Sequence, residues 1–335
     1  MENNIVIENS QQVNLVNYRQ EILNILNVDL IIHIWEPPIN VEEYRGVVLF
    51  LHGMGDHAGR FQHFAEYLVM NGYSCVIPDQ RGHGRSIKNI ASEMGHIYDK
   101  DCINVLADDA YQINQHLKNI LPQRNTGMNS NDRKPIVIGF SMGSFISIVM
   151  MYKYPQLADH YVHLGTNCGS SFISKLSFQI IRLERFRLGK RGVSTILDDI
   201  GEKELNKAFK PQRTAIDYYT RDNDEIDKYQ KDIYCNQSFD NQFWYDMMYC
   251  YNNTISDPKL KKLVPKNTTF LILSGSMDPI GYNGEGPKLF YKQLKNVGIE
   301  NVQLKLYKDA RHDLLHEINK QEVYQDILHY LNSRF

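Results

Sequence analysis

Short apolar runs of strand length alternate with longer amphipathic stretches over much of the chain. The run Val47–Leu51 has no charge and contains β-branched residues, which is typical of a buried strand. The stretch that follows, Arg60–Met70, spaces its apolar residues as a helix does. The same reasoning predicts further strands at Ile22–Asn27, Asp29–Glu36, Tyr73–Ile77, Ile136–Phe140, Tyr161–Leu164, Thr268–Leu273 and Val302–Tyr307, and helices at Cys102–Leu121 and Met142–Tyr154.

This alternation of strands and helices indicates the fold class. Helical crossovers join strands that run in the same direction, so we expect an α/β protein with a mostly parallel sheet and helices on both faces. The strands at Ile22–Asn27 and Asp29–Glu36 are joined by a tight turn and suit an antiparallel edge. Val302–Tyr307 alternates apolar and polar residues, as an edge strand does.

The alternation stops after Gly165, and no convincing strand follows until Thr268. The sequence therefore predicts four parts. Residues 1–18 are polar and irregular, and residues 19–165 and 263–335 form the two halves of the α/β core. Residues 166–262 form a helical insertion, which we call the cap, and which is expected to lie over the active site.

The segment Gly139-Phe140-Ser141-Met142-Gly143 joins a predicted buried strand to a predicted helix. A tight turn between strand and helix holds a serine in a strained conformation with its hydroxyl exposed, and the small residues on either side allow that turn. The N-terminal amides of the following helix favour negative charge beside the serine. Since this pattern also occurs by chance in many proteins, Ser141 becomes a candidate nucleophile only together with catalytic partners.

Two candidate partners each follow a predicted strand. Asp278 lies in the loop after Thr268–Leu273, and His312 lies in the loop after Val302–Tyr307. The chain order serine, acid, histidine is that of α/β-hydrolases, and the carboxyl ends of parallel strands meet at one edge of a sheet. The sequence therefore predicts a triad of Ser141, Asp278 and His312.

Other residues compete for these roles. Asp309 and Asp313 flank His312, but sequence neighbours usually point away from one another, which favours Asp278 as the acid. His316 is expected on the helix after the loop, which favours His312 as the base. His52 and His83 lie in glycine-bounded loops, where we expect them to organise the backbone by hydrogen bonds.

Five segments together resemble the α/β-hydrolase superfamily, and within it the monoacylglycerol lipase and bacterial lysophospholipase group, the serine-aminopeptidase-like hydrolases. Two departures from the pattern of that group are Phe140, where a histidine is common, and Ser144, where a second glycine is common. The resemblance extends from about residue 28 to the C-terminus and is carried by residues 51–61, 79–86, 139–143, 274–279 and 310–317.

The resemblance implies further site residues. The oxyanion hole of this superfamily uses the backbone N–H after the nucleophile and one from the loop after the third strand, which here are those of Met142 and Met54. The supporting loop residues are His52, Gly53, Gly55, Gly139 and Gly143. The mechanism implied for such a site requires no metal and no organic cofactor.

The implied substrate is a small-molecule acyl ester with a long chain, either a monoacylglycerol or a lysophospholipid. A peptidase is the alternative, and it would need cap carboxylates that converge on a substrate ammonium; the candidates are Glu202, Glu204, Asp222 and Asp224. A binding protein that kept the fold without catalysis is a third reading. Aromatic cap residues either line an acyl tunnel or simply pack the cap on the core: Phe172, Phe178, Phe186, Phe243 and Trp244.

Composition narrows the range of functions. The 335 residues carry a formal net charge of −2, which argues against nucleic acid as a partner. The five cysteines are scattered, without metal-like spacing, and the N-terminus has no positively charged, apolar leader, so a cytoplasmic location is expected. No stretch approaches the ~20 apolar residues that span a bilayer. The oligomeric state is not indicated by the sequence.

One cap stretch combines apolar residues at helical spacing with basic ones. Phe172, Leu176, Ile180 and Leu183 are interleaved with a basic set made of Lys175, Arg182, Arg185, Arg187, Lys190 and Arg191. Such a helix can lie peripherally on an anionic lipid surface, and it can equally be an ordinary cap helix with a solvated face. Both readings stay open at this stage.

Overall fold

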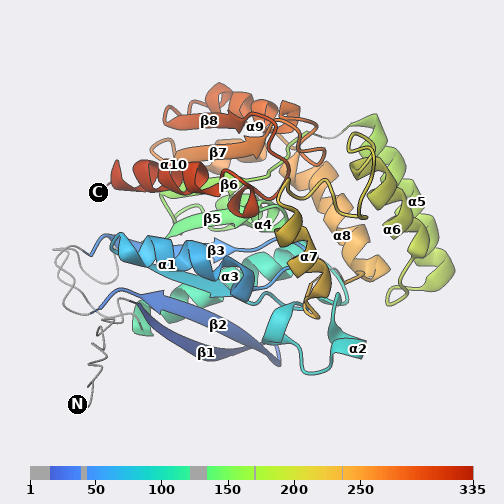
Figure 1. Ribbon diagram of the computed structural model, residues 1–335, viewed down its shortest axis with the longest axis horizontal. Helices are drawn as coiled ribbons and strands as arrows, with labels where there is room; N and C mark the ends of the chain where they lie inside the picture. Colours follow the sequence, from blue (N-terminus) through green and yellow to red (C-terminus); the bar gives the residue numbers. More distant parts are fainter. Residues whose placement is uncertain (1–15, 39–43, 121–133, 170, 236, 335) are drawn as a thin grey trace, which may run out of the picture.

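The computed structural model describes residues 16–38, 44–120, 134–169, 171–235 and 237–334. Its centre is an eight-stranded sheet with the order β1-β2-β4-β3-β5-β6-β7-β8 (Figure 1). The pairs β1–β2 and β2–β4 are antiparallel and all others are parallel. The strands are β1 Asn17–Ile25, β2 Val28–Glu36, β3 Gly46–Leu51, β4 Tyr73–Pro78, β5 Ile136–Phe140, β6 His160–Leu164, β7 Thr269–Gly275 and β8 Val302–Tyr307. This is the α/β-hydrolase architecture that the sequence predicts.

Helices cover both faces of the sheet because successive strand residues point to opposite sides. In β5, Val137 packs with α3 and α4, whereas Ile136 and Ile138 pack with α1 and α10. The core helices are α1 Gln62–Met70, α3 Cys102–Ile120, α4 Met142–Lys153, α9 Glu285–Asn296 and α10 Lys320–Asn332, and a short α2 spans Ile90–Glu93.

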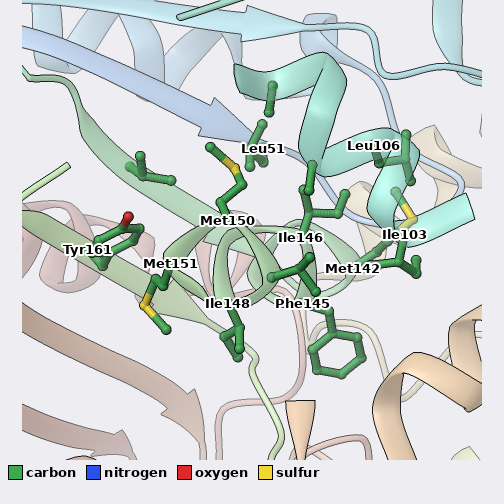
Figure 2. Close-up of a cluster of buried hydrophobic side chains, with 14 of the residues drawn as sticks. Leu51, Ile103, Leu106, Met142, Phe145, Ile146, Ile148, Met150, Met151 and Tyr161 are labelled. Atoms are coloured by element: carbon green, nitrogen blue, oxygen red, sulfur yellow. The ribbon is translucent and has the colours of Figure 1, made fainter. Parts of the chain in front are cut away.

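Helix α4 is buried along almost its whole length, and it sets the position of the residue that precedes it. Its apolar side chains, Ile146 among them, contact Leu51 of β3 and the α3 residues Ile103 and Leu106 (Figure 2). A helix that is apolar all round is held by the core on every side, so the turn between β5 and α4 has little freedom to move.

Four α-helices lie between β6 and β7 in the described part of the chain, in the range predicted for the cap. They are α5 Phe172–Leu188, α6 Thr195–Leu205, α7 Asn223–Lys231 and α8 Asn241–Cys250. Helix α5 packs on α8, and α8 in turn contacts α3 of the core, so α5 and α6 lie at the outer edge of the molecule (Figure 1). No helix among the described residues is long and apolar enough to cross a membrane.

Two expectations from the sequence need correction. The sequence predicts an irregular segment over residues 1–18. Residues 1–15 lie outside the described part of the chain, but Asn17 and Tyr18 belong to β1. For Phe172 and Phe186 both readings, lining an acyl tunnel and packing the cap on the core, are wrong, because these side chains are 82% and 89% exposed. By contrast, Phe243 is fully buried.

Candidate active site

Ser141 occupies the sharp turn between β5 and α4. Its φ of 51° and ψ of −116° fall in a region that a residue with a side chain rarely adopts, and its N–H donates to the Leu164 carbonyl at 2.9 Å. A Cβ atom on Gly143 would lie 1.9 Å from the Leu51 carbonyl oxygen, and one on Gly139 would lie 2.5 Å from the Gly143 carbonyl oxygen. Only glycine therefore allows the chain to pass so close to itself on both sides of the serine.

The three residues predicted from separate loops lie in one hydrogen-bonded series. The distance from Ser141 Oγ to His312 Nε2 is 2.8 Å, and the distance from His312 Nδ1 to Asp278 Oδ2 is 3.0 Å. Asp278 is fully buried and His312 is 1% exposed. The second Asp278 oxygen accepts the Ile280 N–H at 2.9 Å, which fixes the carboxylate in its loop.

These contacts determine which imidazole nitrogen carries the proton. A carboxylate only accepts, so Nδ1 of His312 donates to Asp278 and Nε2 is left to accept from the Ser141 hydroxyl. In this tautomer the imidazole can take the serine proton, and the buried carboxylate can stabilise the resulting positive charge.

The competing residues have other contacts. Asp309 is exposed in the turn after β8, with a φ of 57°. The Asp313 carboxylate accepts from His316 Nδ1 at 2.7 Å, and His316 Nε2 donates to the Arg60 carbonyl at 2.9 Å. Burial alone would raise the pKa of Asp313, but the neighbouring charges of His316 and Arg60 hold it below its ordinary value.

The loop after β3 carries the second predicted oxyanion donor, Met54. His52 anchors this loop: its Nδ1 donates to the Gly53 carbonyl at 2.8 Å, and its Nε2 accepts the Gln80 N–H at 3.1 Å. Burial lowers the pKa of His52, which keeps the ring neutral in this role. Gly55 has a φ of 69°, and its carbonyl accepts the Tyr229 hydroxyl at 2.9 Å. His83, also buried, donates to the Arg81 carbonyl.

The N–H of Met142 is free for a ligand on geometric grounds. Met142 is the first residue of α4, and the first N–H groups of a helix have no acceptor within it. Within the described part of the chain, the Met54 N–H makes no hydrogen bond either. Two backbone donors of this kind are what a developing oxyanion requires.

Comparison with known proteins places the chain in a family. Residues 42–319 match the family described as serine aminopeptidase, S33. The chain belongs to this family of α/β-hydrolases. A Monkeypox virus protein named monoglyceride lipase homolog is 23% identical over 304 residues, which cover 90% of this chain and 93% of that protein. The resemblance read from the five sequence segments is thereby confirmed.

Solved structures confirm the fold of this α/β-hydrolase. A thermostable carboxyl esterase from Bacillus coagulans superposes with a TM-score of 0.82 at 19% identity, over 94% of this chain and 98% of that one. A soluble variant of monoglyceride lipase from Saccharomyces cerevisiae, in complex with a substrate analog, gives a TM-score of 0.69 at 19% identity and 96% of each chain. At these identities the likeness establishes the fold, and the relatives include lipases and esterases.

The two departures from the family pattern have structural roles that the sequence did not reveal. The Phe140 ring lies 5.1 Å from the His312 ring and would contact a Cβ on Gly53 at 3.0 Å, so it supports the histidine and the oxyanion loop together. The Ser144 hydroxyl donates to the Ser141 carbonyl at 2.7 Å and lies 2.9 Å from Thr166 Oγ1. Ser144 therefore ties the start of α4 to the chain after β6.

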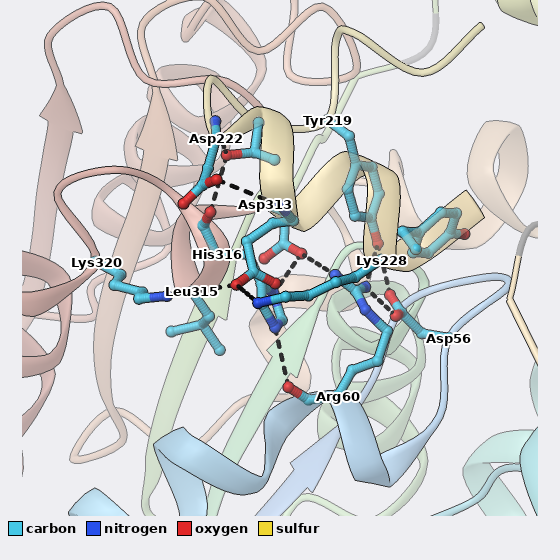
Figure 3. A network of polar contacts seen from close by, with 12 residues as sticks. Asp56, Arg60, Tyr219, Asp222, Lys228, Asp313, Leu315, His316 and Lys320 are labelled. Carbon is cyan, nitrogen blue, oxygen red and sulfur yellow. Dashed lines mark hydrogen bonds and ion pairs between the residues drawn. The ribbon is translucent and has the colours of Figure 1, made fainter. Parts of the chain in front are cut away.

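A buried polar network beside the triad was also missed from the sequence (Figure 3). The Arg60 guanidinium contacts the carboxylates of Asp56 and Asp313, and the Tyr219 hydroxyl donates to Asp56 at 2.6 Å. Asp56 and Arg60 lie within residues 51–61, one of the segments that carry the family resemblance. Their place in that segment could have marked them as candidate site residues. The network joins the oxyanion loop, the histidine loop and a segment between β6 and β7.

A second polar site lies away from the triad. A cleft of about 780 Å³ is lined by Tyr18, Trp35, His57 and Asp232 among others, and by none of the triad residues. His57, Asp232 and Cys235 could offer three metal ligands within 4.8 Å of one another. However, His57 Nδ1 accepts the Gly59 N–H and its Nε2 lies 2.9 Å from Asp232 Oδ2, so Nε2 carries a proton and donates to Asp232. This arrangement is that of a hydrogen-bonded pair, in which the ring nitrogen facing the cluster is not free for a metal.

Proposed function

We propose that this protein is a serine hydrolase that cleaves the carboxylic ester of single-chain acyl lipids, with monoacylglycerols as the first candidates. The observation that carries the proposal is the hydrogen-bonded series from Ser141 through His312 to Asp278, with distances of 2.8 and 3.0 Å. It is supported by the conformation of Ser141, which holds the hydroxyl at the N-terminus of α4.

The proposed reaction has two halves. His312 takes the proton of the Ser141 hydroxyl as Oγ attacks the acyl carbonyl carbon, and Asp278 stabilises the imidazolium. The tetrahedral intermediate collapses when the ester C–O bond breaks and His312 returns the proton to the leaving alcohol. Water then gives its proton to His312 and attacks the acyl-enzyme, which releases the fatty acid and restores the serine.

The Met54 and Met142 amides are proposed to bind the oxyanion in both halves. Loss of one such donor typically raises the barrier by about 3–4 kcal/mol. Because both donors belong to the backbone, their positions depend on the packing of the Met54 loop and of α4 rather than on a removable side chain. This explains why the contacts of His52, Phe140 and Gly143 matter for the proposed chemistry.

The choice of substrate rests on relatives. The viral protein that matches over most of this chain is named a monoglyceride lipase homolog, and the matching yeast structure is a monoglyceride lipase. Lysophospholipids remain the second lipid class to test. The candidate carboxylates with described side chains give the peptidase reading no support: Asp222 accepts N–H groups of α7, Asp224 is exposed, and Glu204 is exposed and lies 3.8 Å from Lys207. The Glu202 side chain lies outside the described part of the structure.

The test combines probe labelling with product analysis. Wild type and Ser141→Ala are reacted with a fluorophosphonate, and free products are measured by mass spectrometry from monoacylglycerols, lysophospholipids and aminoacyl amides. We expect labelling and fatty-acid release by the wild type, with kcat in Ser141→Ala lower by about 10⁴-fold or more. Ser238→Ala is the matched control, since this serine is exposed and bonds only Asp198 among the described residues.

Each outcome distinguishes one reading. Preferential release of amino acids would replace the lipid ester by a peptide-like substrate. Normal hydrolysis by Ser141→Ala would exclude Ser141 as the nucleophile. A wild type that neither labels nor hydrolyses any of the three substrate classes would favour a binding protein.

A further inference from the structure

The outer helix of the cap exposes large apolar side chains to an unusual degree. On α5, Phe172 is 82% exposed, Leu176 53%, Leu183 63% and Phe186 89%. Large exposed apolar patches on a folded protein mark surfaces that bind something. These four residues belong to one helix, and the neighbouring Ile173 adds to them with 65% exposure.

The exposed apolar residues form one stripe along α5. Residues three, four and seven positions apart lie on the same side of a helix, which is the spacing of Phe172, Leu176, Leu183 and Phe186. The opposite side contains the buried Ser174, Ile181 and Glu184. The helix is thus fastened to α8 by one side, and its apolar stripe faces outward on the other.

Basic side chains lie beside this stripe. Lys175 and Arg182 are exposed, and neither forms an ion pair with another described residue. Arg187 lies on the other side of the stripe and pairs with Glu184, which is the only acidic residue of α5 and is buried. The outward side of α5 therefore combines apolar and basic side chains without a carboxylate.

The adjacent helix α6 has the opposite character. Its exposed carboxylates include Asp199, which lies 3.9 Å from Lys203, and Glu204, which lies 3.8 Å from Lys207. An anionic partner would thus be attracted to α5 and not to α6, so the contact is expected to be limited to the α5 stripe and its basic flanks.

We propose that the α5 stripe docks on a lipid bilayer that contains anionic headgroups. Apolar side chains that enter the acyl region, flanked by cations that remain among the headgroups, are the features of a helix lying in a membrane interface. A protein partner would need carboxylates opposite the basic flanks and a groove shaped to the stripe. A bilayer with anionic headgroups needs neither of these to bind a helix of this kind. Such docking determines where the protein works and does not depend on the ester chemistry.

The path of the chain connects this stripe to the triad. Gly165, after β6, lies against the His312 ring, and the Asn167 side chain donates to the Ile280 carbonyl at 2.8 Å, two residues beyond Asp278. Helix α5 begins a few residues later, where the Ser171 hydroxyl lies 3.4 Å from that of Tyr282. The segment that leads into α5 therefore contacts both the acid loop and the histidine loop, and it connects a bilayer bound at α5 to those loops.

The test measures binding without turnover. The full chain, in both wild-type and Ser141→Ala forms, is sedimented with vesicles of phosphatidylcholine alone and of phosphatidylcholine with phosphatidylserine. The apolar variant carries Phe172→Ser, Leu176→Ser and Phe186→Ser. Its matched control carries Ile22→Ser, Met70→Ser and Ile318→Ser, since these side chains are 66%, 67% and 63% exposed but lie outside the cap.

We expect binding to the anionic vesicles that weakens at high salt and that Ser141→Ala retains. The apolar variant should bind more than about tenfold more weakly, with unchanged hydrolysis of a short water-soluble ester and an unchanged melting temperature. Lys175→Gln and Arg182→Gln should each weaken binding on the order of fivefold, since that is the contribution of one cation near an anionic membrane. Lys292→Gln, on the exposed side of α9, should not.

Three results would overturn the proposal. The wild type could stay in the supernatant with both kinds of vesicle. The control variant could lose binding as strongly as the apolar variant. Light scattering could show a wild-type oligomer that the apolar variant converts to a monomer, which would make the stripe an interface between copies of this chain. None of these results bears on fluorophosphonate labelling of Ser141, so the two proposals can fail separately.

Discussion

The Tyr219 hydroxyl donates a 2.6 Å hydrogen bond to the carboxylate of Asp56, two residues after Met54. The carbonyl of the same tyrosine accepts the Asp313 N–H, also at 2.6 Å, one residue after His312. A single residue of the segment between β6 and β7 thus holds both the loop with the proposed oxyanion donor and the loop with the proposed base. Tyr219 is 6% exposed, so neither bond competes with bulk water.

Tyr219→Phe should lower kcat with little change in KM. The variant keeps the ring and the backbone bond to Asp313 but leaves one Asp56 oxygen without its donor, at a cost of about 1–3 kcal/mol. Because Tyr219 is almost fully buried and holds the two loops through Asp56 and Asp313, we expect a loss in kcat, of roughly tenfold. Steady-state kinetics on a soluble ester would measure it, with Tyr67→Phe on α1 as the control. An equal loss in the control, or a change in KM alone, would contradict this positioning role.

Gly165→Ala should displace His312. Gly165 has a φ of 55°, and an added Cβ would lie 2.9 Å from His312 Cε1 and 3.0 Å from Nδ1. Gly298→Ala is the control, since its φ of 87° is also positive while the new methyl group would lie 3.9 Å from Lys266 Cδ, an ordinary contact. Both variants should lose about 1 kcal/mol of stability. Only Gly165→Ala should lose esterase activity, and equal activity in both would argue against the contact.

Asp79, at the end of β4, should stabilise the fold down to low pH. Burial alone would raise its pKa, but a hydrogen bond and charge from His33 and the N–H groups of Arg85 and Ala58 lower it to about 2. The folded pKa lies below the unfolded value, so the stabilisation is complete above about pH 4 and disappears as the pH falls towards 2. The shift corresponds to about 2 kcal/mol.

Asp79→Asn removes this titration and should cost about 2–4 kcal/mol of the free energy of unfolding at neutral pH. Urea unfolding of both proteins between pH 7 and pH 2 is the measurement, where the two curves should converge at the acid end. Curves that stay parallel over the whole range would show that Asp79 does not titrate as its contacts imply.

Features that depend on residues adjacent in the sequence could be predicted. A buried strand needs a run of apolar residues, so the strands before Ser141, Asp278 and His312 could be located from the sequence. The glycines beside Ser141 and the loops of Asp278 and His312 lie directly at the ends of those strands. β1 shows the limit of this signal: none of its residues is buried, and its first half, Asn17–Glu21, is polar. Backbone pairing with β2 forms that part of the strand, so hydrophobicity placed its start too late.

Contacts between distant segments could not be predicted. Tyr219 reaches Asp56 across 163 positions of chain, and Phe140 meets His312 only because β5 and the loop after β8 end at the same edge. The exposed stripe of α5 is a similar case. Its apolar spacing is that of any amphipathic helix, and only the packing of α5 on α8 determines which side is left outside. The sequence thus indicated an amphipathic helix but not its orientation.

Buried neutral histidines should make the protein less stable as the pH falls below about 6.5. Burial lowers the pKa of His163 to about 3, and its ring packs against the aromatic rings of Tyr161, Phe270 and Phe290. His163 Nδ1 donates to Ser147, whereas its Nε2 is buried among the described residues without a partner. Burial also lowers the pKa of His83 to about 3.

The sign of the effect follows from proton uptake. Below about pH 6.5 the unfolded chain protonates these histidines and the folded chain does not, so each reduces the free energy of unfolding by about 1.4 kcal/mol per pH unit. His163→Phe should reduce the change in the free energy of unfolding with pH by about 1.4 kcal/mol per pH unit, which is the contribution of one histidine. This holds even if the substitution changes the absolute stability at pH 7. Denaturant unfolding between pH 7 and pH 5 would test this, and an unchanged slope in His163→Phe would mean that the folded protein accommodates the charged ring.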